Sequence, residues 1–368
     1  MNKYIHTHSD WPRFHWNQET LAVPLAAVRH RQGRLIGRME SLGFPQRGEA
    51  MLQTLTLDVV KSGEIEGEIL NPEQVRSSIA RRLGMDIAGL VPANRRVDGV
   101  VKMALEATQN FAKPLTAERL FGWHAELFPA GAEGAAKIRI GAWREDAQGP
   151  MQVVSGAIGR ERVHYEAPSA DRLGAEMAAF LEWANRTGDI DPVLRAAQAH
   201  LWFVTIHPFD DGNGRIARAI ADWALARSES SSQRFYSMSA QIRRERKEYY
   251  DVLERTQKGA LDVTEWMRWF LDCLDRAIAG TESSLAAVFK TDQFWKTHAN
   301  VAINERQRLI LNKLLDGDFE GKLTSSKWAK LAKCSQDTAQ RDIVDLIDKV
   351  IMVKDGAGGR STSYSLRG

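Results

Sequence analysis

The sequence of 368 residues has little cysteine and no long apolar run. Its two cysteines, Cys273 and Cys334, lie far apart without CxxC spacing, which excludes a disulfide framework and a cysteine zinc site. No eighteen apolar residues run together, which excludes a membrane-spanning helix, and the N-terminus lacks the apolar segment of a signal peptide. We therefore expect a cytoplasmic protein without a membrane partner.

Charge of one sign is also scarce. The sequence has 50 Lys and Arg against 47 Asp and Glu, which leaves a formal net charge of +3. So small an excess gives no argument for a nucleic-acid partner unless a local patch supplies one. The apolar share of 43% and the charged share of 26% are those of an ordinary globular protein, and the length allows two or three domains.

Helical periodicity dominates what the chain does contain. Apolar residues recur at spacings of three and four over 18–43 and 48–70, so residues 1–95 indicate an N-terminal helical domain. A second helical domain, 96–290, is interrupted at 137–168 by Gly, Pro and short alternating runs, a pattern that predicts a β-hairpin. Because one hairpin cannot form a sheet core alone, we expect it to cover a surface as a flap.

The pattern changes again over 300–368. Three short amphipathic helices are followed by strand, turn and strand, which resembles a winged helix-turn-helix domain. DNA is a possible partner of such a domain, but its third helix carries four aspartates that would repel phosphate. They are Asp337, Asp342, Asp345 and Asp348. We therefore expect a mainly α-helical protein whose last domain serves homodimerisation or target docking rather than DNA binding.

One stretch, HPFDDGNGRIAR at 207–218, stands between two helical runs and is rich in residues that handle phosphates. Its Gly-Asn-Gly turn, 212–214, enters the second helix, where unpaired backbone amides and the positive end of the helix dipole make an anion site. Glycine lets the backbone approach a phosphate without a Cβ in the way. Arg215 and Arg218, three residues apart, lie on one face of that helix and would contact further phosphates.

Two more side chains of this stretch fit the same chemistry. Asp211 stands beside the anion site, where a carboxylate is tolerated when Mg²⁺ joins it to substrate phosphates. His207 stands just outside the site, where a neutral imidazole can take a proton from an attacking hydroxyl. The combination indicates phosphoryl or nucleotidyl transfer. A dinucleotide-binding turn is the alternative for GNGRIA, but that turn follows a strand, and HLWFVTI continues a helical pattern.

The stretch resembles the Fic-family signature H-P-F-x-[D/E]-G-N-G-R-x-x-R at every fixed position. The helical run before it, the flap-like hairpin and the closing segment with Tyr249 and Tyr250 are also similar to that family, over about 1–290. The resemblance implies a Fic helical core with a hairpin flap. It also implies transfer of AMP from ATP, with Mg²⁺, to a Ser, Thr or Tyr hydroxyl of a target protein or of the chain itself, with release of pyrophosphate.

By position, the resemblance implies a role for each fixed residue. His207 would be the general base, and Asp211 would be the Mg²⁺ ligand. Arg215 would contact the β-phosphate of ATP and Arg218 its γ-phosphate. The anion hole around the α- and β-phosphates would consist of Gly212, Asn213 and Gly214. A lysine in place of Gly214 marks a kinase branch of the family, so glycine favours nucleotidyl transfer.

Two pairs of residues outside the signature are carried over as well. Tyr249 and Tyr250 match paired tyrosines of the family's nucleobase pocket, and helix packing is the alternative for both. The family's hairpin pairs with the main chain of the target as an added strand. Val153 and Val154 are our candidates for that edge, and ordinary hairpin packing is the alternative.

Ser62, Glu66 and Gly67 fit a second family pattern, [S/T]-x-x-x-E-[G/N], which marks an inhibitory helix. The resemblance implies that Glu66 pairs with Arg218 and displaces the γ-phosphate, which moves the α-phosphate out of line for attack. Gly63, where a second serine is frequent, should weaken the helix by about 1 kcal/mol. A solvated acidic helix face is the alternative for EIEGE. Removal of AMP from targets and nucleotide sensing by a DNA-binding regulator are the alternative functions.

Overall fold

The computed structural model describes residues 3–87, 89–129, 138–147, 149–156, 160–188, 190–315, 321–356 and 362–367. Within these ranges the chain is mainly α-helical, which confirms the predicted fold class, and its strands form two short hairpins. The chain divides into two compact units, residues 1–40 with 48–281 and residues 41–47 with 282–368. Among the described residues, no helix combines the length and the apolar character that crossing a membrane requires.

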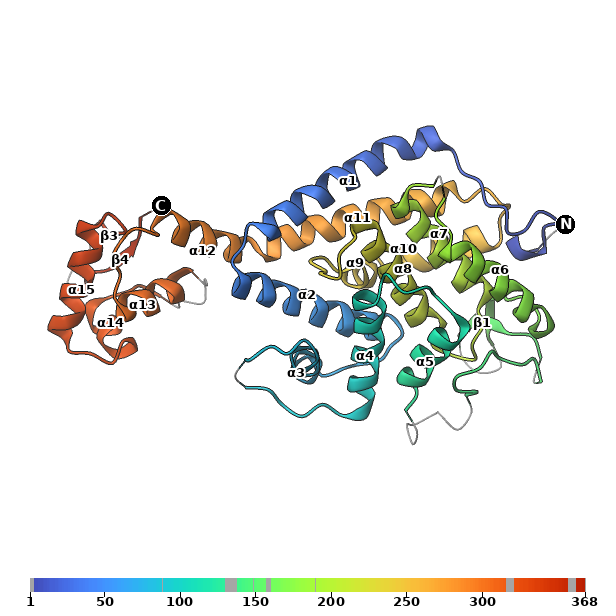
Figure 1. The fold of residues 1–368 in the computed structure, drawn as a ribbon, viewed down its shortest axis with the longest axis horizontal. Helices are drawn as coiled ribbons and strands as arrows, with labels where there is room; N and C mark the ends of the chain where they lie inside the picture. The colour runs from blue at the N-terminus through green and yellow to red at the C-terminus, as the bar shows by residue number, and fades with distance from the viewer. Residues whose placement is uncertain are drawn as a thin grey trace. The chain divides into compact units, whose positions relative to one another are not determined.

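The first unit is a set of packed helices with one hairpin (Figure 1). Its helices are α1 (Gln18–Glu40), α2 (Phe44–Ile65), α3 (Pro72–Arg82), α4 (Arg95–Gln109), α5 (Ala117–Leu127), α6 (Leu173–Asn185), α7 (Pro192–Ile206), α8 (Asn213–Glu229), α9 (Met238–Arg244), α10 (Arg246–Gln257) and α11 (Thr264–Ser284). Short 3-10 turns lie at Ile5–Thr7 and Ala170–Arg172. The first turn of α2 and the last residues of α11 belong to the second unit.

Helix α7 lies in the core of the first unit, buried along nearly its whole length. Every residue from Val193 to Ile206 is buried except Arg195. Helix α8 packs along α7, α4 and α5 pack on α8, and α6 packs on α7. The turn between α7 and α8, which carries the HPFDDGNGRIAR stretch, is therefore anchored by two helices of the core.

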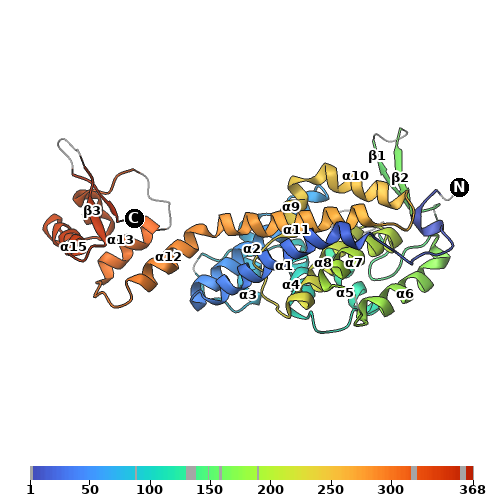
Figure 2. The same ribbon diagram turned by 90° about the horizontal axis from the view of Figure 1, so that it is seen from above.

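The first hairpin consists of β1 (Gln152–Ser155) and β2 (Arg162–Glu166), paired antiparallel with an irregularity between Val153 and Val154. Figure 2 shows it beside α10 and the N-terminal segment. Tyr165 of β2 is buried and meets Tyr4 edge to face, with ring centroids 5.3 Å apart. The strands occupy only the second half of the predicted segment 137–168; residues 138–147 are irregular, and residue 137 lies outside the described residues.

The second unit contains helices followed by a hairpin. Its elements are α12 (Ala286–Thr297), α13 (Glu305–Leu315), α14 (Ser325–Leu331), α15 (Gln336–Asp348), β3 (Met352–Lys354) and β4 (Tyr364–Leu366). Trp328, Ile343 and Leu346 are fully buried in its core. The winged-helix interpretation and any DNA partner stay predictions.

Asp342, one of the four aspartates that we expected to repel phosphate, is buried. Asp342 is 5% exposed and accepts hydrogen bonds from Arg306 Nε at 2.8 Å and Arg306 Nη2 at 3.0 Å. Asp345 accepts hydrogen bonds from Gln307 and Lys349. Asp342 therefore does not contribute to the acidic surface that we expected from the sequence, whereas Asp345 keeps 44% of its side chain exposed. Spacing alone did not reveal which face of α15 is covered by α13.

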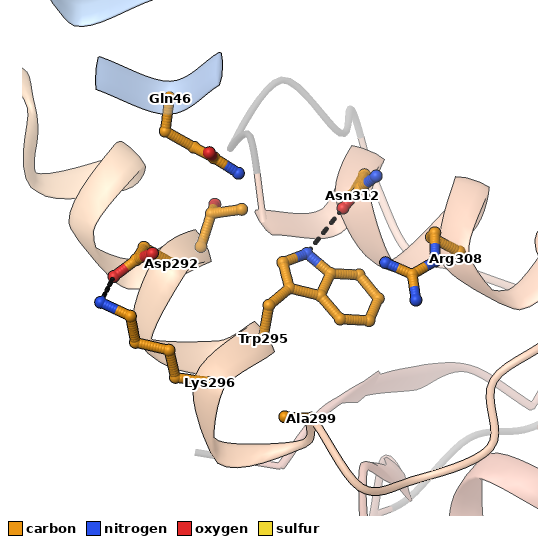
Figure 3. Close-up of a pocket in the computed structure, with 8 residues that line it drawn as sticks. Gln46, Asp292, Trp295, Lys296, Ala299, Arg308 and Asn312 are labelled. Atoms are coloured by element: carbon orange, nitrogen blue, oxygen red, sulfur yellow. Dashed lines mark hydrogen bonds and ion pairs between the residues drawn. The ribbon is translucent and has the colours of Figure 1, made fainter. Parts of the chain in front are cut away.

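The second unit also holds a pocket of about 530 Å³ beside α12 and α13 (Figure 3). Trp295 lines it, and its indole N–H donates to Asn312 Oδ1 at 2.9 Å. Arg308 lies over the indole at 4.5 Å, and Lys296 pairs with Asp292 at 2.7 Å. Each of these polar groups thus has a partner within the unit, and no residue of the HPFDDGNGRIAR stretch lines the pocket.

The close packing of α4 generates a stability prediction. A Cβ added at Gly99 would overlap the carbonyl oxygen of Glu126, whereas one added at Gly37 of α1 would meet nothing within 4 Å. Gly99→Ala should therefore lower the free energy of unfolding by about 1–3 kcal/mol. Gly37→Ala should raise it by about 0.5–1 kcal/mol, because alanine has the higher helix propensity. Urea unfolding followed by circular dichroism measures both, and equal effects of the two variants would contradict the packing.

Candidate functional site

The turn between α7 and α8 contains two residues with positive φ. His207 ends α7 with φ 53° and ψ 57°, and Gly212 precedes α8 with φ 82°. A Cβ added at Gly212 would lie 3.1 Å from Leu127 Cδ1 and 3.1 Å from Phe128 Cε2. Glycine is therefore needed at position 212 for two reasons: the backbone has a positive φ, and the side chains at the end of α5 lie too close for a Cβ.

Asn213 and Phe209 hold this turn from within. The buried Asn213 side chain accepts a hydrogen bond from Phe209 N–H at 3.0 Å and donates one to the Phe209 carbonyl at 2.7 Å. The Phe209 ring stacks on His124 with centroids 4.2 Å apart. Gly141 N–H donates to His124 Nδ1 at 3.1 Å, so His124 Nε2 carries the proton and donates to the Asp211 carbonyl at 3.2 Å. Asn213 thus holds the turn through its side-chain amide, and the backbone N–H of Asn213 is left to bind an anion.

His207 has one ring nitrogen engaged and one left for chemistry. Its Nδ1 lies 3.1 Å from the Val204 carbonyl and donates its proton there. In the neutral ring Nε2 is then unprotonated, as a general base requires. Dehydration of the ring by the surrounding protein lowers the pKa of His207 to about 4; the hydrogen bond to Val204 opposes this shift, and the charge of Arg144 adds to it.

A carboxylate of the same chain lies at the start of α8. Glu66 follows the last residue of α2, and its Oε1 is so near Gly214 that a Cβ added there would overlap it. The same oxygen accepts a hydrogen bond from Arg218 Nη1 at 2.8 Å. Tyr250 Oη donates to the other oxygen, Oε2, at 3.4 Å. The position at which we expect a phosphate is therefore filled by a carboxylate.

Each of the three guanidinium nitrogens of Arg218 donates to Ser62 or Glu66, at or just after the end of α2. In addition to the Glu66 contact, its Nε donates to Ser62 Oγ at 2.9 Å and its Nη2 donates to the Ser62 carbonyl at 3.0 Å. The Arg218 side chain is 3% exposed. Burial opposes its charge, but the adjacent Glu66 raises the pKa of Arg218 overall. Burial likewise opposes ionisation of Glu66, and Arg218 holds the pKa of that carboxyl below its ordinary value.

Glu68 is a second carboxylate of this segment, and we did not single it out from the sequence. Its side chain is 7% exposed; Oε2 accepts a hydrogen bond from Arg215 Nη1 at 2.7 Å, and Oε1 pairs with Arg96. The buried Nε of Arg215 has no hydrogen-bond partner among the described residues. The two signature arginines are therefore each paired with one carboxylate of the EIEGE segment. The repeated acid in EIEGE was the available signal.

Two glycines allow the chain to bring both carboxylates to α8. Gly67, between them, has φ 80°. Glu68 N–H donates to the Gly63 carbonyl at 3.0 Å, and a Cβ added at Gly63 would lie 3.1 Å from the Glu68 carbonyl oxygen and 3.4 Å from the Leu70 side chain. We expected Gly63 only to weaken the helix. Its missing Cβ also gives the returning chain room to approach.

Asp211 is more exposed than the rest of the site. Its side chain is 60% exposed, with Oδ1 accepting from Gly212 N–H at 2.5 Å and Oδ2 lying 3.7 Å from Arg215 Nη2. Within the described ranges no three His, Cys, Asp or Glu side chains group together as metal ligands. A single exposed carboxylate fits Mg²⁺ that is held jointly by the protein and by substrate phosphates.

The two candidate nucleobase residues lie in different surroundings. Tyr249 is 1% exposed, packs on Trp269 with centroids 5.4 Å apart, and has its Oη 3.0 Å from His200 Nε2. Tyr250 is partly exposed and faces Glu66. Tyr250 thus adjoins the carboxylate at α8, while Tyr249 supports it from the core. Their contact with a nucleobase stays a prediction.

The two valines of the hairpin point to opposite sides. Val153 packs against the buried cluster of Tyr4 and Tyr165, whereas Val154 is 48% exposed. This alternation is the ordinary behaviour of successive strand residues. Val154 is available to a partner on the outer face, and the docking role of both residues stays a prediction.

Comparison with known families assigns two segments of the chain. A family described as Fic/DOC matches residues 114–225, which include the turn between α7 and α8. A domain of unknown function, DUF4172, matches residues 4–85, which include Ser62, Glu66 and Gly67.

Individual relatives agree with the first of these matches. The chain is 33% identical over 113 residues to "Protein adenylyltransferase Fic" of Culex quinquefasciatus, which covers 30% of this chain and 21% of that protein. It is 24% identical over 225 residues to the protein of that name in Drosophila grimshawi, which covers 58% of this chain and 40% of that protein. The matches thus span well under half of these relatives.

Solved structures share the fold. The crystal structure of a Fic family protein from Desulfovibrio desulfuricans G20 superposes with a TM-score of 0.57 at 21% identity, covering 96% of this chain and 98% of that one. A Fic domain containing signaling protein from Bacteroides thetaiotaomicron superposes with a TM-score of 0.50 at 19% identity, covering 72% and 97%.

The surroundings of His207 generate a pH prediction. Because its pKa is lowered to about 4, the imidazole should stay neutral from pH 8 down to about pH 5 and gain its proton only below that. NMR observation of the ring carbons and nitrogens during a pH titration measures this directly. It should also show the proton on Nδ1. A midpoint near the ordinary histidine value of about 6.5 would contradict the dehydration of the ring.

Proposed function

From the Fic/DOC family domain that this chain contains at residues 114–225, we propose that the protein transfers AMP from ATP to a hydroxyl group of a target protein, and that residues 62–68 restrain it. The observation that carries the proposal is the position of the Glu66 carboxylate, which lies on Gly214 and pairs with Arg218. An anion is thus held where the start of α8 favours anions. ATP would bring its phosphates to the same groups.

The reaction moves one adenylyl group and one proton. The target hydroxyl oxygen would attack the α-phosphorus of ATP, the bond from that phosphorus to the oxygen bridging to the β-phosphate would break, and pyrophosphate would leave. The hydroxyl proton would pass to His207 Nε2, the nitrogen that the Val204 contact leaves unprotonated. Such chemistry depends mainly on positioning, so the groups that fix the phosphates matter as much as the base.

The start of α8 would hold the triphosphate. Backbone amides of residues 212–214 would bind the α- and β-phosphates, Arg215 the β-phosphate, and Arg218 the γ-phosphate. Asp211 would hold Mg²⁺ jointly with the phosphates, and the ion would supply positive charge to the leaving pyrophosphate.

In this proposal the restraint is a segment with two carboxylates rather than one ion pair. Glu66 covers Arg218 at 2.8 Å and Glu68 covers Arg215 at 2.7 Å. Arg246 Nε donates to the carbonyl just before Glu66 at 2.7 Å, which attaches the same turn to α10. Removing one partner of a buried ion pair costs about 3–5 kcal/mol, so phosphates would have to replace the carboxylates as they leave.

Removal of AMP, with Glu66 acting on a water molecule, has less support. Although burial raises the pKa of Glu66, Arg218 brings it below the ordinary value, so the paired carboxylate is a poor proton acceptor. His207 has an unprotonated Nε2 and is better suited as the base. We therefore favour transfer to a hydroxyl as the main activity.

The function is tested by incubating wild type, Glu66→Gly and His207→Ala with ATP labelled on the α- or the γ-phosphate. Label from the α-phosphate should enter protein, and Glu66→Gly should incorporate it at roughly ten times the wild-type rate if the restraint opposes ATP by about 1.4 kcal/mol. His207→Ala should incorporate none. Incorporation from γ-labelled ATP would refute AMP transfer, and equal rates in wild type and Glu66→Gly would refute the restraint.

The role of Glu68 generates a second prediction, made in the Glu66→Gly background. Glu68→Gln removes the negative charge that pairs with Arg215, so the β-phosphate no longer competes with a carboxylate for that arginine. KM for ATP should therefore fall by roughly threefold to tenfold, the equivalent of about 1 kcal/mol. Glu73→Gln is the matched control, because Glu73 is exposed in the first turn of α3, outside residues 62–68. A rise in KM with Glu68→Gln would show instead that Glu68 orients Arg215 for ATP.

A further inference from the structure

A buried arginine outside the HPFDDGNGRIAR stretch holds the backbone of that stretch. The Arg144 side chain is 0% exposed, and Arg144 lies in the irregular segment before β1. Its Nε donates to the His207 carbonyl at 2.8 Å, and its backbone N–H donates to the Pro208 carbonyl at 2.9 Å. One residue thus binds two consecutive carbonyl groups of the turn.

Those two carbonyls directly follow a strained point of the backbone. His207 lies in the left-handed region, with φ 53° and ψ 57°, which residues other than glycine adopt only when their surroundings hold them there. The direction in which the imidazole leaves the main chain depends on these two angles. The contact of Nδ1 with Val204 fixes the rotation of the ring but not the backbone that carries it.

The same guanidinium also contacts the chain on both sides of the β1–β2 hairpin, before β1 and after β2. Nη1 donates to Asp146 Oδ1 at 2.6 Å, and Nη2 donates to the Pro168 carbonyl at 2.5 Å. Asp146 Oδ2 in turn accepts from Ala170 N–H at 2.5 Å. Asp146 precedes β1 and Pro168 follows β2, so Arg144 ties the base of the hairpin to the turn that carries His207.

We infer that Arg144 is a positioning residue. It keeps the His207 backbone in the conformation that directs Nε2 toward the attacking hydroxyl, and it links that conformation to the base of the hairpin. The inference rests on the proposed function, because it concerns the placement of the base in that reaction. The role needs several N–H donors in one plane, which a guanidinium supplies and an ammonium or a carboxamide does not. A residue that only packed the core would affect stability and leave the folded enzyme's turnover unchanged.

The kinetic test uses the full chain with Glu66→Gly and compares Arg144→Gln and Arg144→Lys with Arg186→Gln. The Arg186 side chain is 70% exposed and pairs with Glu182 on the surface. With α-labelled ATP, kcat should fall by roughly 100-fold in both Arg144 variants, the effect of a misplacement of about 1 Å, while KM for ATP changes by less than about twofold. Arg186→Gln should change neither constant.

A second readout does not depend on activity. After dehydration of the ring, the charge of Arg144 is among the causes that lower the pKa of His207. In an NMR titration, Arg144→Gln should therefore raise the pKa of His207 above its starting value of about 4, and Arg144→Lys, which keeps the charge, should raise it less. If Glu66→Gly transfers no AMP, the proposed function fails, and this titration still tests whether the charge of Arg144 acts on the His207 ring.

An unchanged kcat in either Arg144 variant, a KM that rises in step with the fall in kcat, or an unmoved His207 titration would overturn the inference. If Arg144→Gln does not fold, Arg144→Lys and Asp146→Asn decide. Asp146→Asn leaves the contact with His207 in place and should retain most of the kcat. Failure of all three variants to fold would also overturn it, since Arg144 would then be a determinant of folding alone.

Discussion

The left-handed backbone at His207 and Gly212 is the constraint on which the rest of the site depends. It lets the chain leave α7 and enter α8 within six residues, so His207 and the start of α8 are carried by one short turn. Both helices are buried, and Asn213 and Phe209 fill the turn between them. A site carried by core helices varies little in geometry, which suits chemistry that depends on positioning.

An anion site built from buried arginines needs anions at all times. Arg215 and Arg218 are 6% and 3% exposed, and a buried guanidinium without a partner is costly. Residues 62–68 supply the two carboxylates when no phosphate does. In the proposed function, the segment that restrains the enzyme therefore also stabilises its fold, and ATP stabilises the activated form by mass action.

The sequence predicts features that depend on local patterns, such as helices. It does not predict contacts that depend on how the backbone turns, such as those of Glu68 and Arg144. Apolar periodicity sufficed for the mainly helical class, because helix faces repeat along the chain. The pairing of Glu66 with Arg218 spans 152 positions and was predicted only through resemblance. Glu68 turns inward because of the backbone at Gly63 and Gly67, which spacing does not reveal. Arg144 binds three backbone carbonyls, and since every residue has one, no pattern of side chains marks its partners.

Because restraint and substrate would use the same two arginines, release of the restraint has to begin away from them. A change that weakens the binding of a carboxylate to Arg218 also weakens the binding of a phosphate to it. An activating signal that acted on α8 would therefore impair the AMP transfer that it is meant to release. The contacts on the other side of the segment carry no such penalty. Arg246 holds the carbonyl before Glu66, and Arg243 lies 3.3 Å from Glu64 with 45% of its side chain exposed. Loosening these contacts frees residues 62–68 and leaves the phosphate groups of the site intact.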